Sequence, residues 1–594
     1  MFGWFSGKKE KKKYEPSQKD KRQAFYDALS PVRQELYRLI PEIHEHNAGV
    51  ADLILKAMYD SDDAQLKLWL LGKAIPSVPP LLQERIKNIG KKAGWATVNQ
   101  IIDAGLSKAH PPFDRLYPGW FETEEGDALL MYFGEGHLLT VAPTGAGKGQ
   151  GHIIPALLDY KGPVVVLDPK GENYRETAWR RRWCGDVFKW APFEEETDCF
   201  NPLDFVAGYD DARVLAGLLM GAESGKDPFW DRSAKDLLIG LILSVKKSRS
   251  SDLQNMREVC RLLAPSKTEY EEFISSLRSA QDERLLETAN ILEDQSESVR
   301  MNIFQTLRAH LDVWRSDEIT RATSTTSEDF YPPGILQQQA MHDLQASLNQ
   351  GEREGPSVHM REEDDGSKTQ TFVRGGGASV FLIMPPEKIG SYASVMRVIL
   401  GVFINEITKA VADLERKEGP DTRDHQTPIM FLLDELPQLG YMDVLENAIA
   451  IARSSRIRLW LFAQALDQLT AIYPKAETLI ANCRMKMFFR PADLKTAQYI
   501  SEHLGQQESL FGEKTWLATP QELMGPDYLD FQTCFASGSV PIKSRLRLKY
   551  KDPELLDFER QYRPYWDEQD DRKDMSGRLF KRKPPEDEVP TAEE

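Results

Sequence analysis

The sequence predicts a doubly wound α/β core that is interrupted by an all-helical insertion. Short apolar runs that end in polar residues recur on both sides of the insertion, for example at 164–167 and 429–433. Such runs are typical of strands buried on both faces of a parallel sheet. Segments with helical periodicity separate them, and strand, helix and strand in this order build a parallel sheet.

The composition narrows the function classes. A chain of 594 residues with 41% hydrophobic and 28% charged residues indicates a globular protein with several domains or one large core with insertions. The formal net charge of -17 argues against a surface that coats nucleic acid, so any nucleic-acid role must be local. The five cysteines have no short paired spacing, which suits a reducing cytoplasm and argues against a zinc ribbon. We expect no transmembrane helix, because no apolar run approaches about 18 residues.

Changes in pattern along the chain predict the domain boundaries. The expected parts are a helical N-terminal segment, an α/β domain in two pieces, an all-alpha domain and a polar loop between those pieces, and a charged C-terminal tail. Their boundaries are 1–114 for the N-terminal segment, 115–206 and 377–550 for the α/β domain, 207–330 for the all-alpha domain, 331–376 for the loop and 551–594 for the tail.

Residues 140–151, TVAPTGAGKGQG, resemble a phosphate-binding loop altered at both ends. The usual pattern is Gly, four residues, Gly-Lys and then Ser or Thr, whose hydroxyl holds Mg²⁺. Here Ala142 replaces the first Gly and Gly149 replaces the hydroxyl residue. Water can fill the lost ligand position, since Mg²⁺ commonly keeps several waters. A Gly-rich turn that merely contains a lysine is the alternative.

As a working loop, this segment would bind the phosphates of a nucleoside triphosphate. Lys148 would neutralise the β and γ phosphates, and backbone N–H groups at the helix N-terminus would surround them. Thr144 replaces the missing hydroxyl only if the loop turns its side chain toward the metal. The expected binding residues are Thr144, Gly145, Ala146, Gly147, Lys148 and Gly149.

Two later strands end in residues that complete such a site. The run IMFLL is followed by Asp434, which can hold Mg²⁺, and by Glu435, which can orient or deprotonate the attacking water. The next strand, RLWLFA, ends in Gln464, which is suited to sense the γ phosphate or that water. A buried amide bonded to backbone is the alternative for Gln464. Arg453 precedes that strand, where an arginine of a ring ATPase can reach the neighbouring subunit's nucleotide; a surface salt bridge is the alternative.

These motifs together resemble those of the TraG/TraD-like type IV secretion coupling proteins, relatives of the FtsK and RecA-like motor ATPases. The resemblance covers about residues 125–550 and rests on several motifs in the family's order. It implies a RecA-like P-loop ATPase domain with an inserted all-alpha domain, using ATP and Mg²⁺. It also implies a catalytic role for Arg453, and one branch of the family carries Gly after the loop lysine. The motifs are GHLLTVAPTGAGKGQGHIIPALL, DPKGENYRETA, NPLDF, DPFW, SEDF, LLDELPQLG, AQALDQLTAIYP and IANCR.

The resemblance implies an ATPase that delivers a relaxosome substrate to a secretion channel during conjugative DNA transfer. The expected partners are further copies of the chain in a homo-hexamer, DNA in a relaxase complex or effector proteins, and channel components. The family usually begins with transmembrane helices, whereas this chain has a soluble helical segment there. We therefore expect a cytoplasmic protein that partners hold at the bacterial inner membrane. Two alternatives stay open: a recruitment platform for effector proteins with little ATP turnover, and an FtsK-like double-stranded DNA translocase.

The segment KSRLRLKYK at 543–551 carries basic residues at every second position. On a single strand they would share one face and could contact a phosphate backbone. An edge strand protected by charge is the alternative. The residues are Lys543, Arg545, Arg547, Lys549 and Lys551.

Overall fold

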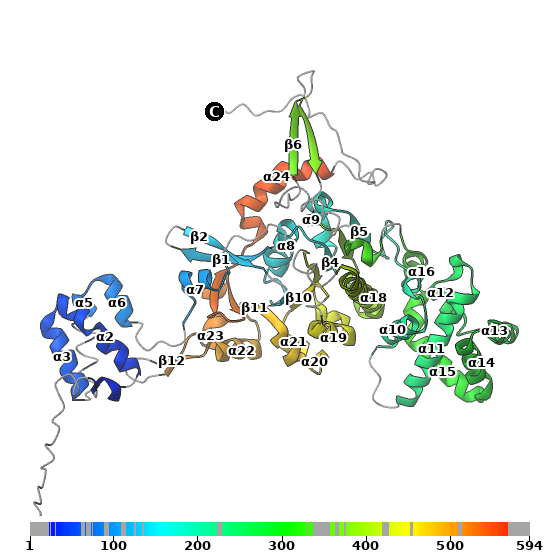
Figure 1. Cartoon of the computed structure of the whole chain (residues 1–594), viewed down its shortest axis with the longest axis horizontal. Coiled ribbons are helices and arrows are strands. Elements are labelled where there is room, and N and C mark those ends of the chain that lie inside the picture. Colours follow the sequence, from blue (N-terminus) through cyan, green and yellow to red (C-terminus); the bar gives the residue numbers. More distant parts are fainter. Residues whose placement is uncertain are drawn as a thin grey trace, which may run out of the picture. The chain divides into compact units, whose positions relative to one another are not determined.

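The structure is a computed structural model that forms two compact units, which we describe separately (Figure 1). One unit contains residues 1–95 and 498–521, and the other contains residues 96–497 and 522–594. The described residues are 23, 25–29, 31–60, 66, 70, 73, 75–87, 94–107, 115–123, 126–133, 136–221, 228–327, 330–336, 357–362, 368–373, 376–418, 427–451, 455–508 and 514–567.

An eleven-stranded sheet forms the core of the larger unit, in the order β2-β1-β15-β14-β11-β3-β10-β9-β4-β8-β5. The strands from β11 to β5 are parallel, and β14, β15, β1 and β2 continue the sheet with antiparallel pairing. The parallel strands are β3 His137–Val141, β4 Val164–Leu167, β5 Val187–Trp190, β8 Ser379–Leu382, β9 Ile429–Leu433, β10 Ile457–Ala463 and β11 Cys483–Phe489. The antiparallel strands are β1 Leu116–Thr123, β2 Gly126–Tyr132, β14 Phe531–Ala536 and β15 Ile542–Arg545.

Burial explains why the parallel strands are recognisable in the sequence. Every residue of β3, β4, β8, β9 and β10 is buried. Strands covered on both faces need mostly apolar side chains, so their sequences are apolar runs with few polar residues, such as Thr140 of β3 and Arg458 of β10. The expected α/β fold class is confirmed.

Helices precede, connect and follow the strands of this sheet, although residues 498–504 of α22 and 520–521 of α23 belong to the smaller unit. These helices are α7 Val98–Asp103, α8 Ile154–Asp159, α9 Glu172–Cys184, α18 Pro386–Glu418, α19 Asp443–Ile451, α20 Leu466–Ile472, α21 Ala476–Asn482, α22 Leu494–Leu504, α23 Pro520–Leu523 and α24 Pro553–Asp567. Short 3-10 turns are η3 Pro202–Phe205, η7 Leu436–Leu439, η8 Pro526–Tyr528 and η9 Lys549–Lys551. No described helix is long and apolar enough to span a membrane.

A group of helices without a described strand lies between β5 and β8 in the sequence. Side-chain caps explain several of its boundaries: Ser266 and Glu269 form a capping box, and Asp282 and Ser296 accept from backbone N–H groups of the helices they precede. The helices are α10 Tyr209–Met220, α11 Pro228–Ser248, α12 Met256–Arg261, α13 Lys267–Ser279, α14 Glu283–Asp294, α15 Glu297–Leu311 and α16 Asp317–Thr323, with η4 Ser251–Leu253 and η5 Asp312–Arg315. A two-stranded hairpin follows, made by β6 Ser357–Glu362 and β7 Lys368–Val373.

The smaller unit has its own apolar core. Helices α2 Pro31–His46, α3 Ala48–Tyr59, α5 Ile75–Ser77 and α6 Pro80–Lys87 contribute buried side chains such as Leu36, Ile43 and Ile54. Asn47 caps α3 by accepting from the N–H of Val50 at 3.2 Å. A short antiparallel pair in this unit is formed by β12 Gln506–Glu508 and β13 Lys514–Trp516.

The basic segment at 543–551 is not a single strand, so that expectation was wrong. β15 ends at Arg545, and residues 549–551 form the 3-10 turn η9. Three of the basic side chains of this segment contact acidic partners or aromatic rings. Arg545 pairs with Asp127, Lys551 with Asp530 at 3.2 Å, and the Lys543 ammonium lies 4.4 Å from the ring centre of Tyr528. The shared basic face that carried the nucleic-acid hypothesis is therefore not formed.

The two remaining basic residues of this segment, Arg547 and Lys549, are buried and form ion pairs that connect α24 with α8 and α9. Arg547 is 2% exposed and pairs with Asp159 of α8 and, at 2.6 Å, with Asp552. Lys549 pairs at 2.7 Å with Glu176 of α9 and with Glu559 of α24. Asp552 also accepts from the first N–H groups of α24. These buried pairs join β15, α8, α9 and α24.

We predict that Arg547→Met destabilises this unit strongly. The substitution keeps most of the side-chain volume but leaves the carboxylates of Asp159 and Asp552 buried without their shared cation. A loss of about 3–5 kcal/mol in the free energy of unfolding is expected, measured by thermal and urea unfolding of the full chain. Lys551→Met is the matched control, because its exposed pair contributes about 1 kcal/mol or less. Equal effects of the two substitutions would contradict the structural role of Arg547.

Candidate nucleotide-binding site

The phosphate loop, defined here as residues 143–149, follows β3 at the carboxyl edge of the sheet. The N–H of Ala142 donates to Ala463 O at 2.9 Å, which continues the pairing of β3 with β10 into the start of the loop. Gly145 has φ 77° and Gly147 has φ 88°, a backbone region that favours glycine. These two glycines let the loop turn sharply before the helical segment that starts at Gly149.

The helical segment begins with a π turn, η2 Gly149–Ile153, and continues as α8. Pro155 has no N–H to donate to Gly151 O, which removes one α-helical bond at this place. A Cβ atom added to Gly149 would have no heavy atom within 4 Å, so there is space for a side chain at the position where a hydroxyl residue is usual.

A chain of buried hydrogen bonds holds this helical segment on the sheet. His152 donates from Nε2 to Pro118 O at 3.0 Å, so its Nδ1 accepts from the Thr140 hydroxyl at 2.9 Å. Trp460 of β10 donates to the same hydroxyl oxygen at 2.9 Å. Burial lowers the pKa of His152 to about 3, so the ring is neutral near pH 7.

Lys148 lies between the two carboxylates at the end of β9. Its Nζ is 3.1 Å from Asp434 Oδ1 and donates to Glu435 Oε1. The three side chains are 15%, 17% and 14% exposed, respectively. Glu435 has φ 58°, which is uncommon for a residue with a Cβ atom and is a frequent feature of functional sites.

Gln464 and Thr144 extend this cluster. Gln464 Nε2 donates to Glu435 Oε2 at 3.0 Å, and the Thr144 hydroxyl donates to Gln464 Oε1 at 2.8 Å. The strand order makes this contact possible, because β10 lies between β3 and β9 and all three end at the same edge. The loop therefore directs the Thr144 hydroxyl at Gln464.

Burial favours the neutral forms of Lys148 and Asp434 and shifts their pKa values in opposite directions. Desolvation lowers the pKa of Lys148, while Asp434 opposes that shift and Lys170 adds to it. Desolvation likewise raises the pKa of Asp434, and Lys148 opposes it. Each charge is therefore kept in this buried position by the other.

Asp168, at the end of β4, organises the neighbouring loop. It is 1% exposed, and its carboxylate accepts from Tyr174 N at 2.8 Å and from Asn173 Nδ2 at 3.2 Å. Desolvation raises the pKa of Asp168 to about 6, backbone hydrogen bonds oppose the shift, and Asp434 adds to it. Its hydrogen bonds fix the turn into α9.

The carboxylate of Asp434 fits a magnesium ligand. In the described part of the chain, its buried Oδ1 has no aligned hydrogen-bond donor, although the Lys148 ammonium is nearby. Mg²⁺ is usually bound by one or two carboxylates together with phosphate oxygens and water, so one carboxylate beside the phosphate loop is sufficient. No cluster of three or more metal-ligating side chains occurs among the described residues.

The structure brings Thr144, Lys148, Asp434, Glu435 and Gln464 together. Arg453 lies outside the described residues. Sequence reasoning missed the hydrogen-bond chain of Thr140, His152 and Trp460, and the bond from Thr144 to Gln464. The position of His152, four residues after the loop lysine, was a signal for the hydrogen-bond chain. Its partners Thr140 and Pro118 lie on other elements, so the sequence alone does not identify them.

Two family models match the sequence. The model described as "Type IV secretory system Conjugative DNA transfer" matches residues 84–332, and that described as "TraM recognition site of TraD and TraG" matches residues 428–515. Together they cover more than half of the chain, including the phosphate loop and the carboxylates of β9. The chain belongs to the type IV secretion coupling proteins.

Individual relatives of this coupling protein are distant. The conjugal transfer protein TraG of Escherichia coli is 25% identical over 74% of this chain and 68% of its own length. VirD4 of Agrobacterium fabrum (strain C58 / ATCC 33970) is 26% identical over 70% of this chain and 56% of its own length. The chain thus spans about 56–68% of these two curated relatives.

Solved structures show the same fold. The plasmid coupling protein TrwB in complex with an ATP analogue, ADPNP, has a TM-score of 0.53 and 15% identity, covering 77% of this chain and 93% of its own. TrwB in complex with ADP and Mg²⁺ has the same TM-score of 0.53 and covers 94% of its own chain. The expected RecA-like domain with an all-alpha insertion is confirmed for this coupling protein.

We predict that His152→Leu lowers the free energy of unfolding by an amount that depends on pH. The substitution removes the acceptor for the Thr140 hydroxyl and the donor to Pro118 O. Near pH 7.5 the loss of stability should be about 1–3 kcal/mol. The folded pKa of His152, about 3, lies below the ordinary value of about 6.5. The contribution of the neutral ring is therefore complete above about pH 6.5 and is lost as pH falls toward 3.

The stability difference between wild type and His152→Leu should consequently narrow between about pH 7.5 and pH 4.5 in thermal unfolding. His46→Leu, the same substitution at an exposed position of α2, is the control. A difference that stays constant across this range would argue against a neutral, hydrogen-bonded His152.

Proposed function

We propose that this protein is an ATPase of type IV secretion that recruits a DNA–protein substrate and delivers it to the secretion channel during conjugative DNA transfer. The observation that carries the proposal is the cluster in which Lys148 of the phosphate loop contacts Asp434 and Glu435, and Gln464 donates to Glu435. Membership of the coupling-protein family supports the transfer role.

Each side chain of the cluster has a role in ATP hydrolysis. Lys148 exchanges its carboxylate partners for the β and γ phosphate oxygens, and the N–H groups of residues 145–149 bind the phosphates. Asp434 holds Mg²⁺, which supplies positive charge to the phosphate oxygens when bound. Glu435 orients and deprotonates the attacking water, and Gln464 holds the Glu435 carboxylate through the hydrogen bond already present.

Thr144 and Gly149 modify this scheme. The Thr144 hydroxyl supports Gln464, so Thr144 acts on the catalytic carboxylate through a second side chain. Gly149 provides no metal ligand, and a water molecule takes that position. Arg453 of a neighbouring subunit stabilises charge in the transition state, which makes hydrolysis dependent on a ring, and we propose a homo-hexamer.

The substrate is proposed to be a relaxase–DNA complex, with effector proteins as the alternative cargo. The match to the model for TraM recognition supports an interaction with a relaxosome component. Channel components of the secretion system are the further partners, and they hold the protein at the inner membrane face.

We predict that Glu435→Gln keeps ATP binding and loses at least about 100-fold in hydrolysis, because the amide cannot accept the proton of the attacking water. Lys148→Ala should lose both activities, since the phosphates lose their charge partner. Steady-state phosphate release, measured without DNA and with single- or double-stranded DNA, tests both variants. DNA stimulation that disappears in Glu435→Gln would support a motor.

Glu387→Gln, in the first turn of α18, is a control with the same chemical change outside the cluster. An assembled wild-type ring with no more hydrolysis than Glu435→Gln would contradict the ATPase proposal and favour a recruitment platform.

A second prediction concerns Gly149→Ser. The open space around Gly149 accommodates the side chain, and the hydroxyl can replace a water ligand of Mg²⁺. We expect unchanged thermal stability and a Mg²⁺ concentration for half-maximal hydrolysis that falls by about two- to tenfold. A magnesium titration of ATP hydrolysis measures this. Gly149→Ala, which adds a Cβ without a hydroxyl, is the control, and equal behaviour of the two variants would contradict a metal-binding role.

A further inference from the structure

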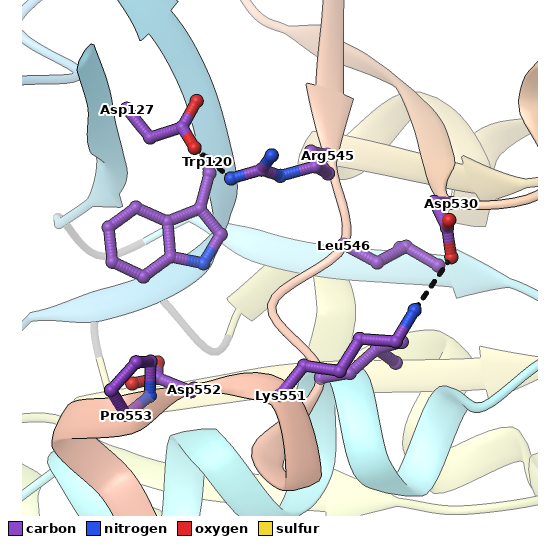
Figure 2. A pocket seen from close by; sticks show the side chains of 9 residues that line it. Trp120, Asp127, Asp530, Arg545, Leu546, Lys551, Asp552 and Pro553 are labelled. Carbon is purple, nitrogen blue, oxygen red and sulfur yellow. Dashed lines mark hydrogen bonds and ion pairs between the residues drawn. The ribbon is translucent and has the colours of Figure 1, made fainter.

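A pocket of about 520 Å³ lies beside the phosphate loop. Its volume falls within the range of roughly 300–1,000 Å³ that is common for small-molecule sites. Residues from β1, β2 and β15, from the segment between β15 and the start of α24, and Asp530 before β14 line it. These strands lie on the side of β3 opposite β10 and β9. Figure 2 shows Trp120 on one side of the pocket, Lys551 on another, and Arg545 with Asp127 between the strands.

The pocket and the phosphate loop share a wall. Leu546 and Leu548 line the pocket and also pack with Ala142, Ala146 and Phe489 in one apolar cluster. A Cβ atom on Gly147 would lie 3.4 Å from Leu548 Cδ2, which places this leucine directly against the loop. A ligand bound at the loop can therefore extend over these leucines into the pocket.

The chemistry of the lining suits an uncharged aromatic group with polar edges. Trp120 provides an indole for stacking, and the two leucines provide apolar walls. Each basic side chain in the lining forms an ion pair with an acidic one: Arg545 pairs with Asp127, and Lys551 Nζ lies 3.2 Å from Asp530 Oδ1. This balance gives little attraction for additional phosphate, whereas the carboxylates can accept from amino and hydroxyl groups.

We propose that this pocket binds the adenine and ribose of the nucleotide, with Trp120 as the stacking residue for the base. The inference rests on the proposed ATP binding at Lys148. Glu435 and Gln464 occupy the side of the loop toward β9 and β10, where the terminal phosphate reacts. The nucleoside end therefore extends to the opposite side of the loop, toward β15 and the segment after it, where the pocket lies.

Two ligands separate base recognition from phosphate recognition. Inorganic tripolyphosphate carries the phosphates of ATP without the nucleoside, so only the phosphate loop contributes to its binding. Isothermal titration of the full chain in Mg²⁺, with ATP and with tripolyphosphate, gives both affinities for each variant. Lys148→Ala should weaken both ligands.

Trp120→Ala should raise the Kd for ATP by about tenfold and leave the Kd for tripolyphosphate within about twofold, since stacking on an aromatic side chain contributes binding energy only to the base. Trp120→Phe keeps an aromatic face and should retain most of the ATP affinity. Trp516→Ala, an exposed tryptophan of β13, is the matched control and should change neither affinity.

The outcomes separate this inference from the proposal on which it rests. A wild-type chain that binds neither ligand contradicts ATP binding itself. A wild-type chain that binds ATP while Trp120→Ala leaves its affinity unchanged overturns the base pocket alone. Equal weakening of both ligands in a folded Trp120→Ala also overturns it, because the residue would then act on the phosphate loop.

Photolabelling of the unmodified chain provides a test that needs no variant. With 8-azido-ATP, the label should be found in peptides that contain Trp120 or the segment 546–553, and excess ATP should prevent labelling. Label that excess ATP removes but that occurs only in other peptides would overturn the assignment.

Discussion

The buried ammonium of Lys148 between Asp434 and Glu435 is the interaction on which the site depends. A lysine in this position would be costly without its partners, and two adjacent carboxylates would repel each other without the lysine. The pKa of Lys148 is lowered and that of Asp434 is raised by burial, so each group needs the opposite charge to stay ionised. A triphosphate with Mg²⁺ would offer the same balance of charge: in the proposed site, phosphate oxygens would take the place of the carboxylates around Lys148, and Asp434 would hold the metal.

The order of the strands determines which residues can take part in that exchange. Because β10 lies between β3 and β9, an amide at the end of β10 reaches both the loop and the carboxylate. Gln464 uses its two polar atoms for the two neighbours, accepting from Thr144 and donating to Glu435. A change in the phosphate loop can therefore pass to the carboxylate of Glu435, the proposed catalytic group, through one side chain.

Much of this arrangement could be predicted from the sequence because buried parallel strands are largely apolar runs. The runs that end at Leu433 and Ala463 indicate both the strands and the polar residues at their carboxyl ends. The segment at 543–551 could not be predicted in this way. Its alternating basic pattern indicates a strand, but the buried acids Asp159 and Asp552 draw Arg547 inward, and those acids belong to other elements. The positive φ of Glu435 and the bond from Thr144 to Gln464 likewise depend on contacts that are distant in the sequence.

The same buried pairs connect α24 with the proposed nucleotide site. Arg547 fixes the chain between Leu546 and Leu548, and these leucines pack against the phosphate loop on one face and line the adjoining pocket. Since α8 carries both Asp159 and, through η2, the residues after Lys148, a shift of α24 would move the wall of the pocket and the helix behind the loop together. Protein interiors are densely packed and transmit such shifts, so the segment after β15 is placed to link α24 to the proposed nucleotide site.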